Sequence, residues 1–174
     1  KLDDALHQKI LNFYSENSAS LQIENVAGGY IETDGEGSAS HTIEMPNDLR
    51  DEVHQSLLNK AQDWSGIRLL PTYVYGVRIY NRGAILKSHR DREETHIIGV
   101  IINIDQKVDS PWILEIQDHQ KNNHEICLSP GEIIFYESAT LDHGRPSPLD
   151  GDSFVNVFCH YMPYMSQEGE EGEV

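Results

Sequence analysis

The sequence predicts a mainly β protein in which flanking helices cover one face of an antiparallel sandwich or barrel. Two amphipathic segments occupy much of the first 65 residues, and short β-type runs separated by turn residues follow from residue 66. A chain of 174 residues fits one domain with a sizeable core. We therefore expect a single domain over residues 1–174, with helical support to about residue 65, a β core over 66–163 and an acidic tail over 164–174.

Apolar residues at helical spacing predict the two helices. The first spans residues 3–16, where the acidic start suits the helix dipole. The second opens at Pro46-Asn47-Asp48. Residues 18–45 between them are rich in Gly, Ser and acids, which predicts a short strand or two joined by loops. The apolar positions are Leu6, Ile10, Phe13 and Tyr14 in the first helix and Leu49, Val53, Leu57 and Ala61 in the second.

The β core is predicted from runs rich in β-branched and aromatic residues. Turn signals at Lys121–Asn123 and Pro130-Gly131 separate some of these runs. Around eight short strands after two helices favour a sandwich or closed barrel that is backed by the helices. The runs are residues 67–70, 72–80, 84–89, 96–104, 112–117, 125–128, 132–136 and 154–161.

Charge and hydropathy exclude several kinds of partner. The net charge is −16, from 29 acidic and 13 basic residues, and such a surface repels phosphate backbones, so we expect no nucleic-acid substrate. No apolar run approaches the ~20 residues of a membrane span, and no secretory signal is visible, so we expect a soluble cytoplasmic protein. The chain begins at Lys1 rather than Met, which is compatible with removal of an upstream segment. Cys127 and Cys159 lie in strand-like runs and predict buried thiols rather than a disulfide.

The stretch around His89-Arg90-Asp91 carries the strongest chemical signal. On an extended strand, residues two apart project to one face, so His89 and Asp91 offer an imidazole and a carboxylate side by side. His143 follows 54 residues later, after several further strands, and a double-stranded barrel would return it beside the first pair. Two imidazoles and one carboxylate on one face of a metal form the facial triad of non-heme Fe(II) oxygenases. We expect His89, Asp91 and His143 to bind iron.

The residues around these ligands resemble a known family. Tyr80 and Gly83 stand nine and six positions before His89, the segment from Pro130 to Tyr136 resembles a Gly-Asp-containing strand, and His143-Gly144 is followed by prolines and Gly151. Together these motifs resemble the catalytic domain of the 2-oxoglutarate- and Fe(II)-dependent dioxygenases, most closely the prolyl 4-hydroxylase-like branch. The resemblance covers about half of the chain, residues 72–162.

The resemblance implies a double-stranded β-helix (jelly-roll) core with Fe(II) at one mouth. It further implies 2-oxoglutarate and O2 as cosubstrates, with ascorbate as a possible further cofactor, and hydroxylation of an unactivated C–H bond with release of succinate and CO2. Prolyl residues in a peptide or protein are the favoured substrate, although the branch also includes enzymes acting on small molecules. The oligomeric state is not implied.

One departure from the family concerns the far carboxylate of the cosubstrate. By family position Tyr80 would hydrogen-bond that carboxylate, although a Tyr at this position could equally be a core residue. The family usually places a Lys or Arg ten positions after the second His, where this chain has Ser153. Because a buried dianion without a cation is costly, another cation is needed. The candidates are Arg78, on the same strand face as Tyr80, and Arg145, two residues after His143. Ser153 could add a hydroxyl, and both arginines could instead be structural.

Two other classes of protein remain open. A jelly-roll or cupin-like binding protein, metal-free or with a structural metal, would explain the missing basic residue at position 153. A cupin dioxygenase without cosubstrate would favour a third His where Asp91 stands. A halogenase of this fold is disfavoured because Asp91 supplies the carboxylate. His96, His119, His124 and His160 could support the metal ligands from outside, but a lone histidine is more often an ordinary packed or solvated side chain, which is what we expect of each.

Overall fold

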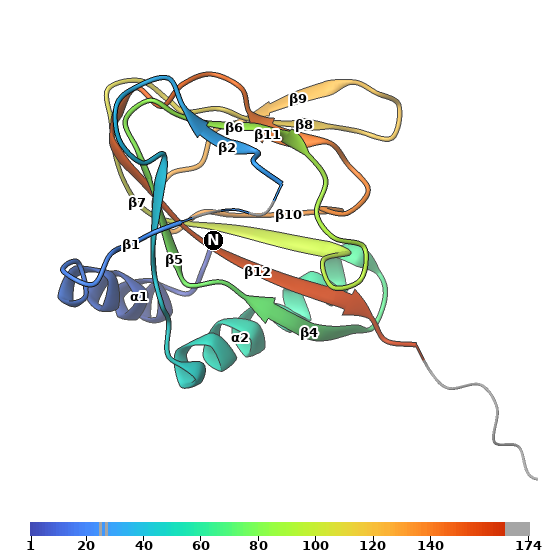
Figure 1. Cartoon of the computed structure of the whole chain (residues 1–174). Coiled ribbons are helices and arrows are strands. Elements are labelled where there is room, and N and C mark those ends of the chain that lie inside the picture. Colours follow the sequence, from blue (N-terminus) through green and yellow to red (C-terminus); the bar gives the residue numbers. More distant parts are fainter. Residues whose placement is uncertain (25, 27, 166–174) are drawn as a thin grey trace, which may run out of the picture.

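The computed structural model describes residues 1–24, 26 and 28–165, and it shows two antiparallel sheets packed face to face with two helices on one side (Figure 1). We call the sheet next to the helices the major sheet. Its strand order is β1-β3-β5-β12-β7-β10, with β4 also paired to β12. The minor sheet has the order β2-β6-β11-β8-β9. The chain passes between the sheets repeatedly, as in a jelly roll, so the predicted fold class is confirmed.

The strands are short, apart from two that run through the centre of the major sheet. The major sheet contains β1 (Gln22–Ile23), β3 (Ser40–Ile43), β4 (Leu69–Val74), β5 (Val77–Asn81), β7 (Ile98–Val108), β10 (Ile133–Tyr136) and β12 (Gly151–Pro163). The minor sheet contains β2 (Ile31–Thr33), β6 (Ala84–His89), β8 (Leu114–Gln117), β9 (Asn123–Ile126) and β11 (His143–Arg145).

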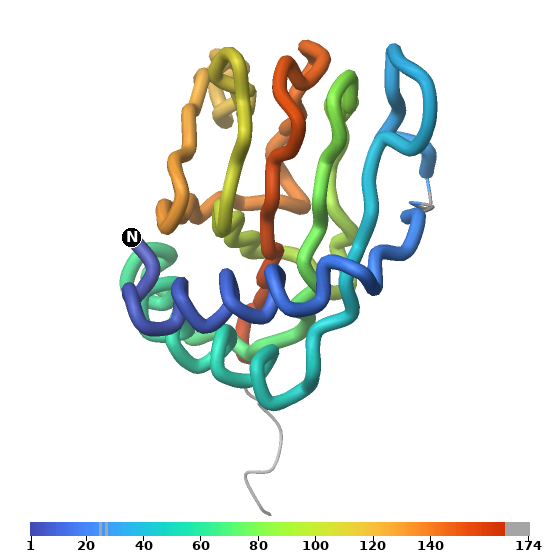
Figure 2. The backbone as a smooth tube through the Cα atoms, turned by 90° about the vertical axis from the view of Figure 1, so that its left-hand side faces the viewer, coloured from blue at the N-terminus to red at the C-terminus, as the bar shows by residue number. Residues whose placement is uncertain are grey.

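The helices α1 (Asp4–Glu16) and α2 (Asn47–Ser65) cover the outer face of the major sheet, as Figures 1 and 2 show. The side chain of Asp3 caps α1 by accepting hydrogen bonds from the backbone N–H groups of Ala5 and Leu6, at 3.0 and 3.2 Å. α2 ends at Gly66, whose φ of 73° lies in the left-handed region that favours glycine. The caps therefore fix where the two amphipathic segments begin and end.

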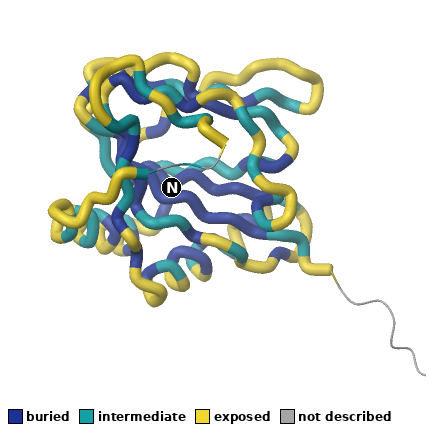
Figure 3. The backbone as a smooth tube through the Cα atoms, viewed as in Figure 1, coloured by how far each residue is buried: buried dark blue, intermediate teal, exposed yellow. Residues whose placement is uncertain are grey.

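Two hydrophobic cores follow from the side-chain alternation along β12. Val155, Val157 and Cys159 face the helices, whereas Phe154 and Phe158 face the space between the sheets. Figure 3 shows the buried backbone concentrated along the central strands of the major sheet. The core between the sheets carries the polar side chains discussed below, so it also positions the candidate site.

The structure differs from the sequence-based expectations in several places. Residues 18–45 contain three short strands, of which β1 and β3 join the major sheet and β2 joins the minor one, so both sheets begin before residue 66. Cys127 is exposed and only Cys159 is buried, so the prediction of two buried thiols was wrong for Cys127, which lies just beyond the edge strand β9. Most of the acidic tail lies outside the described residues. None of the described helices is long and apolar enough to cross a membrane.

Candidate metal centre

His89, Asp91 and His143 come together at the end of β6, where β11 lies beside it. The register pairs the Cα of His143 with that of His89, so backbone pairing alone brings the two imidazoles together. Asp91 follows two residues beyond the end of β6, and its backbone N–H donates to the carbonyl of Ser138 at 2.9 Å. Gly144 allows the close approach of β11 to β6, because a Cβ there would lie 2.8 Å from the carbonyl oxygen of Leu86.

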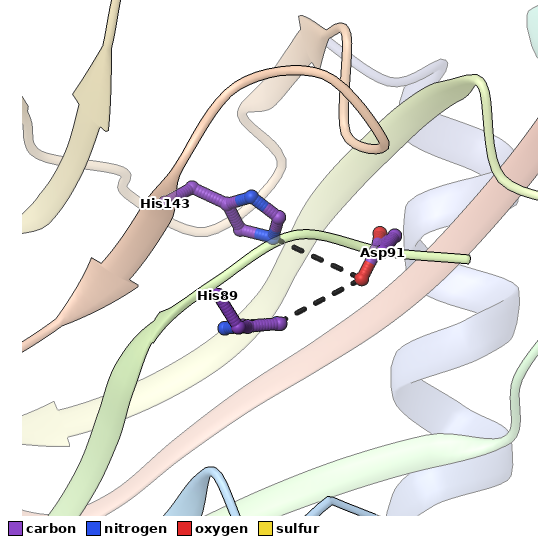
Figure 4. A group of neighbouring side chains, drawn as sticks. All are labelled: His89, Asp91 and His143. Atoms are coloured by element: carbon purple, nitrogen blue, oxygen red, sulfur yellow. Dashed lines mark ion pairs between the residues drawn. The ribbon is translucent and has the colours of Figure 1, made fainter. Parts of the chain in front are cut away.

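The three side chains present one potential ligand atom each toward a common point (Figure 4). These atoms all lie within 4.8 Å of one another. The Oδ1 atom of Asp91 is 3.7 Å from Nε2 of His89 and 3.9 Å from Nε2 of His143. Two metal–ligand bonds of about 2.0–2.2 Å place their ligand atoms at most about 4.4 Å apart. The two separations that involve Asp91 fit one shared ion, and the whole set fits after a small contraction.

Backbone carbonyls fix the tautomers of both imidazoles. Nδ1 of His89 lies 2.8 Å from the carbonyl oxygen of Lys87, and Nδ1 of His143 lies 3.0 Å from that of Leu141. A carbonyl oxygen can only accept, so each Nδ1 carries the proton and each Nε2 keeps its lone pair. Neighbouring rings support this orientation: Tyr30 stacks on His89 with centroids 4.0 Å apart, and Tyr136 packs edge-on against His143 at 4.8 Å. Both imidazoles are thus held ready to coordinate a metal.

Burial sets the charge state of the site. It lowers the pKa of His89 and of His143, whose ring is 3% exposed, so both are neutral at pH 7. Burial also raises the pKa of Asp91, although the nearby His89 and His96 oppose that shift. A divalent cation would offset the cost of burying the carboxylate, and neutral imidazoles do not repel it.

Two cavities with shared lining residues lie beside Asp91, and the smaller is also lined by His89 and His143. A small one of about 40 Å³ lies between the sheets, and a larger one of about 620 Å³ opens beyond it; both are bordered by Tyr30, Tyr75, Arg78, Asp91 and His96. The small cavity is also lined by Tyr80, Leu86, Ile101, Tyr136, Phe158 and His160. The large cavity is also lined by Glu24, Val26, Gly28, Arg90 and Arg92. The arrangement provides an inner space beside the ligands and an outer one through which a second molecule could reach them.

Arg78 lines both cavities and already has an acidic partner. Its Nε and Nη2 atoms donate to the two carboxylate oxygens of Glu24 at 2.7 and 2.6 Å, and its Nη1 donates to the hydroxyl of Tyr80 at 3.4 Å. Both side chains of the ion pair are largely buried. Sequence reasoning selected Arg78 and Tyr80 but missed Glu24, because the 54 residues between Glu24 and Arg78 give no local signal of their pairing.

Arg145 is buried without an acidic partner among the described residues. It is 1% exposed, its guanidinium lies 4.7 Å from the ring centroid of Trp112 and 4.6 Å from that of Phe154, and Nη1 donates to the carbonyl of Trp112. Its Nη2 has no hydrogen-bond partner in that part of the chain. Burial lowers its pKa to about 10. Ser153 is partly exposed, is not among the residues that line either cavity, and pairs with Asn81 and Lys107.

Two further histidines lie beside Asp91, although we had expected ordinary packed or solvated side chains. Nδ1 of His160 is 3.9 Å from Oδ2 of Asp91, and the His96 ring packs against His160 at a tilt of 31°, with centroids 3.8 Å apart. The alternation along β12 that turns Phe158 into the space between the sheets could have placed His160 there too, once the direction of that face was known. His119 and His124 lie elsewhere, exposed and paired with Glu137 and Asp118.

Comparison with known proteins rests on structure, since no protein-family model and no curated protein matches the sequence. A prolyl-4-hydroxylase from Pseudomonas putida is 13% identical, with a TM-score of 0.60 over 94% of this chain and 89% of that one. A Trichoplax adhaerens prolyl hydroxylase, solved with a hypoxia-inducible-factor peptide, is 13% identical, with a TM-score of 0.66 over 92% and 80%. The fold is that of the Fe(II)- and 2-oxoglutarate-dependent oxygenases.

The same oxygenase fold also serves proteins with small-molecule ligands. HygX from Streptomyces hygroscopicus, solved with nickel, 2-oxoglutarate and hygromycin B, is 12% identical, with a TM-score of 0.63 over 92% of this chain and 80% of that one. The predicted jelly roll and the resemblance to this superfamily are therefore confirmed at the level of fold. At these identities the chemistry of this chain has to be argued from its own residues.

Proposed function

We propose that this protein is an Fe(II)- and 2-oxoglutarate-dependent dioxygenase that hydroxylates an unactivated C–H bond, with release of succinate and CO2. The observation that carries the proposal is the convergence of the ligand atoms of His89, Asp91 and His143 within 4.8 Å, beside a cavity between the sheets. Oxygenases of the proposed class bind iron through such a set and leave the other coordination positions open.

The donor set fits a catalytic rather than a structural metal. Two neutral imidazoles and one carboxylate supply three ligands, whereas structural zinc sites are closed by four, often with thiolates. Cys127 is exposed and Cys159 packs against the helices, and neither belongs to the set, which supports the same choice. When bound, iron with 2-oxoglutarate and O2 would supply the oxidising chemistry. A further role for ascorbate as a cofactor is implied by the family resemblance alone. The protein's own part is to orient the ligands and to limit the access of water.

Arg145 is the residue that we propose to bind the far carboxylate of 2-oxoglutarate. A buried guanidinium with an unpaired Nη2 is costly, and an incoming carboxylate would remove that cost. Its guanidinium lies over Phe154, which faces the space between the sheets and directly follows Ser153, the position of the family's usual basic residue. Tyr80 lines the inner cavity and its ring meets that of Trp112 edge-on at 5.0 Å, so Arg145, which lies over Trp112, is separated from that cavity by aromatic rings alone.

Arg78 is the competing candidate and lines the inner cavity itself. Its charge is already balanced by Glu24, so a second carboxylate would have to displace that side chain or share the cation with it. Ser153 and Arg145 are both absent from the residues that line the two cavities, so each would reach 2-oxoglutarate only after a rearrangement. We favour Arg145 because its Nη2 is unpaired within the described chain whereas the charge of Arg78 is already balanced, and variants of the two arginines separate the possibilities.

A substrate would reach the metal through the outer cavity. Prolyl residues in a peptide or protein are the favoured substrate on the family resemblance. A polar small molecule is the second candidate, and its support is the charged lining, to which Glu24, Arg78, Arg90 and Arg92 contribute. Arg90 is paired with Asp142, and Arg92 donates to the hydroxyl of Tyr75 at 3.3 Å. Substrate-dependent succinate formation with prolyl peptides and with charged small molecules, compared side by side, tests the choice.

Calorimetry tests the proposed class against a jelly-roll binding protein. Mn(II) is titrated first, and 2-oxoglutarate is then titrated with and without the metal present. Tight binding of 2-oxoglutarate only in the presence of the metal is the expected result, because the keto acid end is held by the metal and the far end by the protein. A protein that binds the metal but shows no metal-dependent binding of 2-oxoglutarate would be a metal-binding jelly roll and not an oxygenase.

A further inference from the structure

The two carboxylate oxygens of Asp91 face different partners. Oδ1 faces the Nε2 atoms of His89 and His143, at 3.7 and 3.9 Å. Oδ2 faces Nδ1 of His160, at 3.9 Å. His160 comes from β12, in the major sheet, so the carboxylate lies between the ligands on one side and an imidazole from the opposite sheet on the other.

The Nδ1 atom of His160 is buried and makes no hydrogen bond within the described chain. The residue as a whole is 2% exposed. An imidazole nitrogen that carries a proton can donate to a carboxylate oxygen, and Nδ1 is the ring nitrogen of His160 that faces Oδ2 of Asp91. A buried, unpaired polar atom of this kind is unusual in a folded protein and calls for an explanation.

The other polar groups near Asp91 are already engaged. The hydroxyl of Ser138 donates to the carbonyl of His96 at 2.7 Å, which uses its only proton. The ring nitrogens of His96 lie 2.5 Å from Oγ1 of Thr95 and 3.1 Å from the hydroxyl of Tyr75, so that ring is held in place. The tilted ring of His96 packs against His160, with centroids 3.8 Å apart, and limits its movement, so His160 is held beside Oδ2.

We propose that His160 is a positioning residue whose Nδ1–H donates to Oδ2 of Asp91 when Oδ1 binds the metal. A shift of roughly 1 Å brings the two atoms from 3.9 Å into hydrogen-bond range. The hydrogen bond would hold the carboxylate to coordination through one oxygen, which keeps a further position on the metal free. The inference rests on the proposed metal site, and it adds an outer partner of the kind that orients metal ligands in general.

Mn(II) binding, measured by calorimetry without 2-oxoglutarate, tests the inference through three variants. His160→Phe keeps an aromatic ring but removes the donor, and His160→Gln places its amide near the Nε2 rather than the Nδ1 position. Both should weaken Mn(II) binding by about 10- to 100-fold, the usual cost of losing an outer partner. His160→Asn places an amide N–H near the Nδ1 position, so its affinity should stay within about threefold of the wild type.

His7→Phe is the control. His7 lies on α1, on the helix side of the major sheet, and its Nε2 lies 2.8 Å from the carbonyl oxygen of Ile104. The same substitution there should leave Mn(II) affinity unchanged. Wild-type affinity in His160→Phe and His160→Gln would overturn the inference, and so would an equal loss in His160→Asn. If His160→Phe fails to fold, the comparison of His160→Gln with His160→Asn still decides. Failure of the wild type itself to bind Mn(II) would refute the metal site and not His160 specifically.

Discussion

Replacing Arg145 with Met tests the proposed binding of 2-oxoglutarate most sharply. Met keeps an unbranched apolar side chain between Trp112 and Phe154 but removes the guanidinium. Removing one partner of a buried charge pair costs about 2–5 kcal/mol, so we expect the Kd for 2-oxoglutarate to rise by about 30- to 4,000-fold. Calorimetry on the Mn(II)-loaded protein measures the change directly, without turnover.

The fold of the Arg145→Met variant should survive, because the opposing terms nearly cancel. The substitution loses two cation–π contacts of about 0.5–2 kcal/mol each and leaves the Trp112 carbonyl unpaired, at about 1–3 kcal/mol. It also removes a buried cation without a counter-charge, whose desolvation costs several kcal/mol. We expect the free energy of unfolding of the ligand-free protein to change by less than about 2 kcal/mol, as measured by urea denaturation.

Arg78→Met should give the reverse pattern. It leaves the largely buried carboxylate of Glu24 without its cation, which costs about 3–5 kcal/mol of stability. For a chain of this size each kcal/mol corresponds to about 2–4 °C in Tm, so the loss is easily seen by thermal denaturation. If Arg145→Met binds 2-oxoglutarate like the wild type while Arg78→Met does not, the assignment to Arg145 is refuted and Arg78 takes its place.

Two further predictions concern pH and backbone packing. Burial lowers the pKa of five histidines in the folded protein. Below about pH 6.5 the unfolded chain therefore binds more protons than the native one, and the free energy of unfolding of the metal-free protein should fall as the pH drops from 7 to 5. The raised pKa of Asp91 changes the stability in the opposite direction, but at a lower pH, near 4. Urea denaturation measures the stability across this range, and a stability that stays constant from pH 7 to 5 would contradict the account. Gly144→Ala should weaken Mn(II) binding at least tenfold, roughly the factor seen when the support of a metal ligand is lost. The new Cβ would lie 2.8 Å from the Leu86 carbonyl oxygen and 2.9 Å from the Ser88 nitrogen, and it would therefore force β11 away from β6. Gly35→Ala, where a Cβ would meet Thr33 Oγ1 at an ordinary 3.6 Å, is a control for Mn(II) binding, and equal affinity in both variants would show that strand separation does not matter.

Much of the fold and the ligand set follows from local sequence patterns. The spacing of apolar residues located both helices, and the alternation of β-type runs located most strands. His89 ends β6 and Asp91 follows it by two residues, so their proximity is local in the sequence. That His143 lies beside them required the chain to return through a barrel, which the spacing of the runs and the resemblance together predicted.

The outer parts of the site depend on tertiary register and were not predictable from local patterns. β11 has only three residues, too few to show a period of two. Glu24 meets Arg78 because β1, β3 and β5 are neighbours in the major sheet, and nothing in the sequence near Glu24 indicates this. His160 faces Asp91 only because the alternation along β12 turns that residue inward. A change of one residue in strand register would turn it to the helix side.

The most direct test of the central claim is Mn(II) binding by the wild type and by Asp91→Ala, followed by addition of 2-oxoglutarate. We expect one Mn(II) per wild-type chain and metal-dependent binding of 2-oxoglutarate. The Asp91→Ala variant should lose both, and should retain its fold because burial, which raises the pKa of Asp91, already disfavours the charged carboxylate in the metal-free protein. Loss of succinate formation with Fe(II) should accompany the loss of binding. Equal Mn(II) affinity in the two proteins would contradict the assignment of Asp91, and with it the proposed oxygenase chemistry.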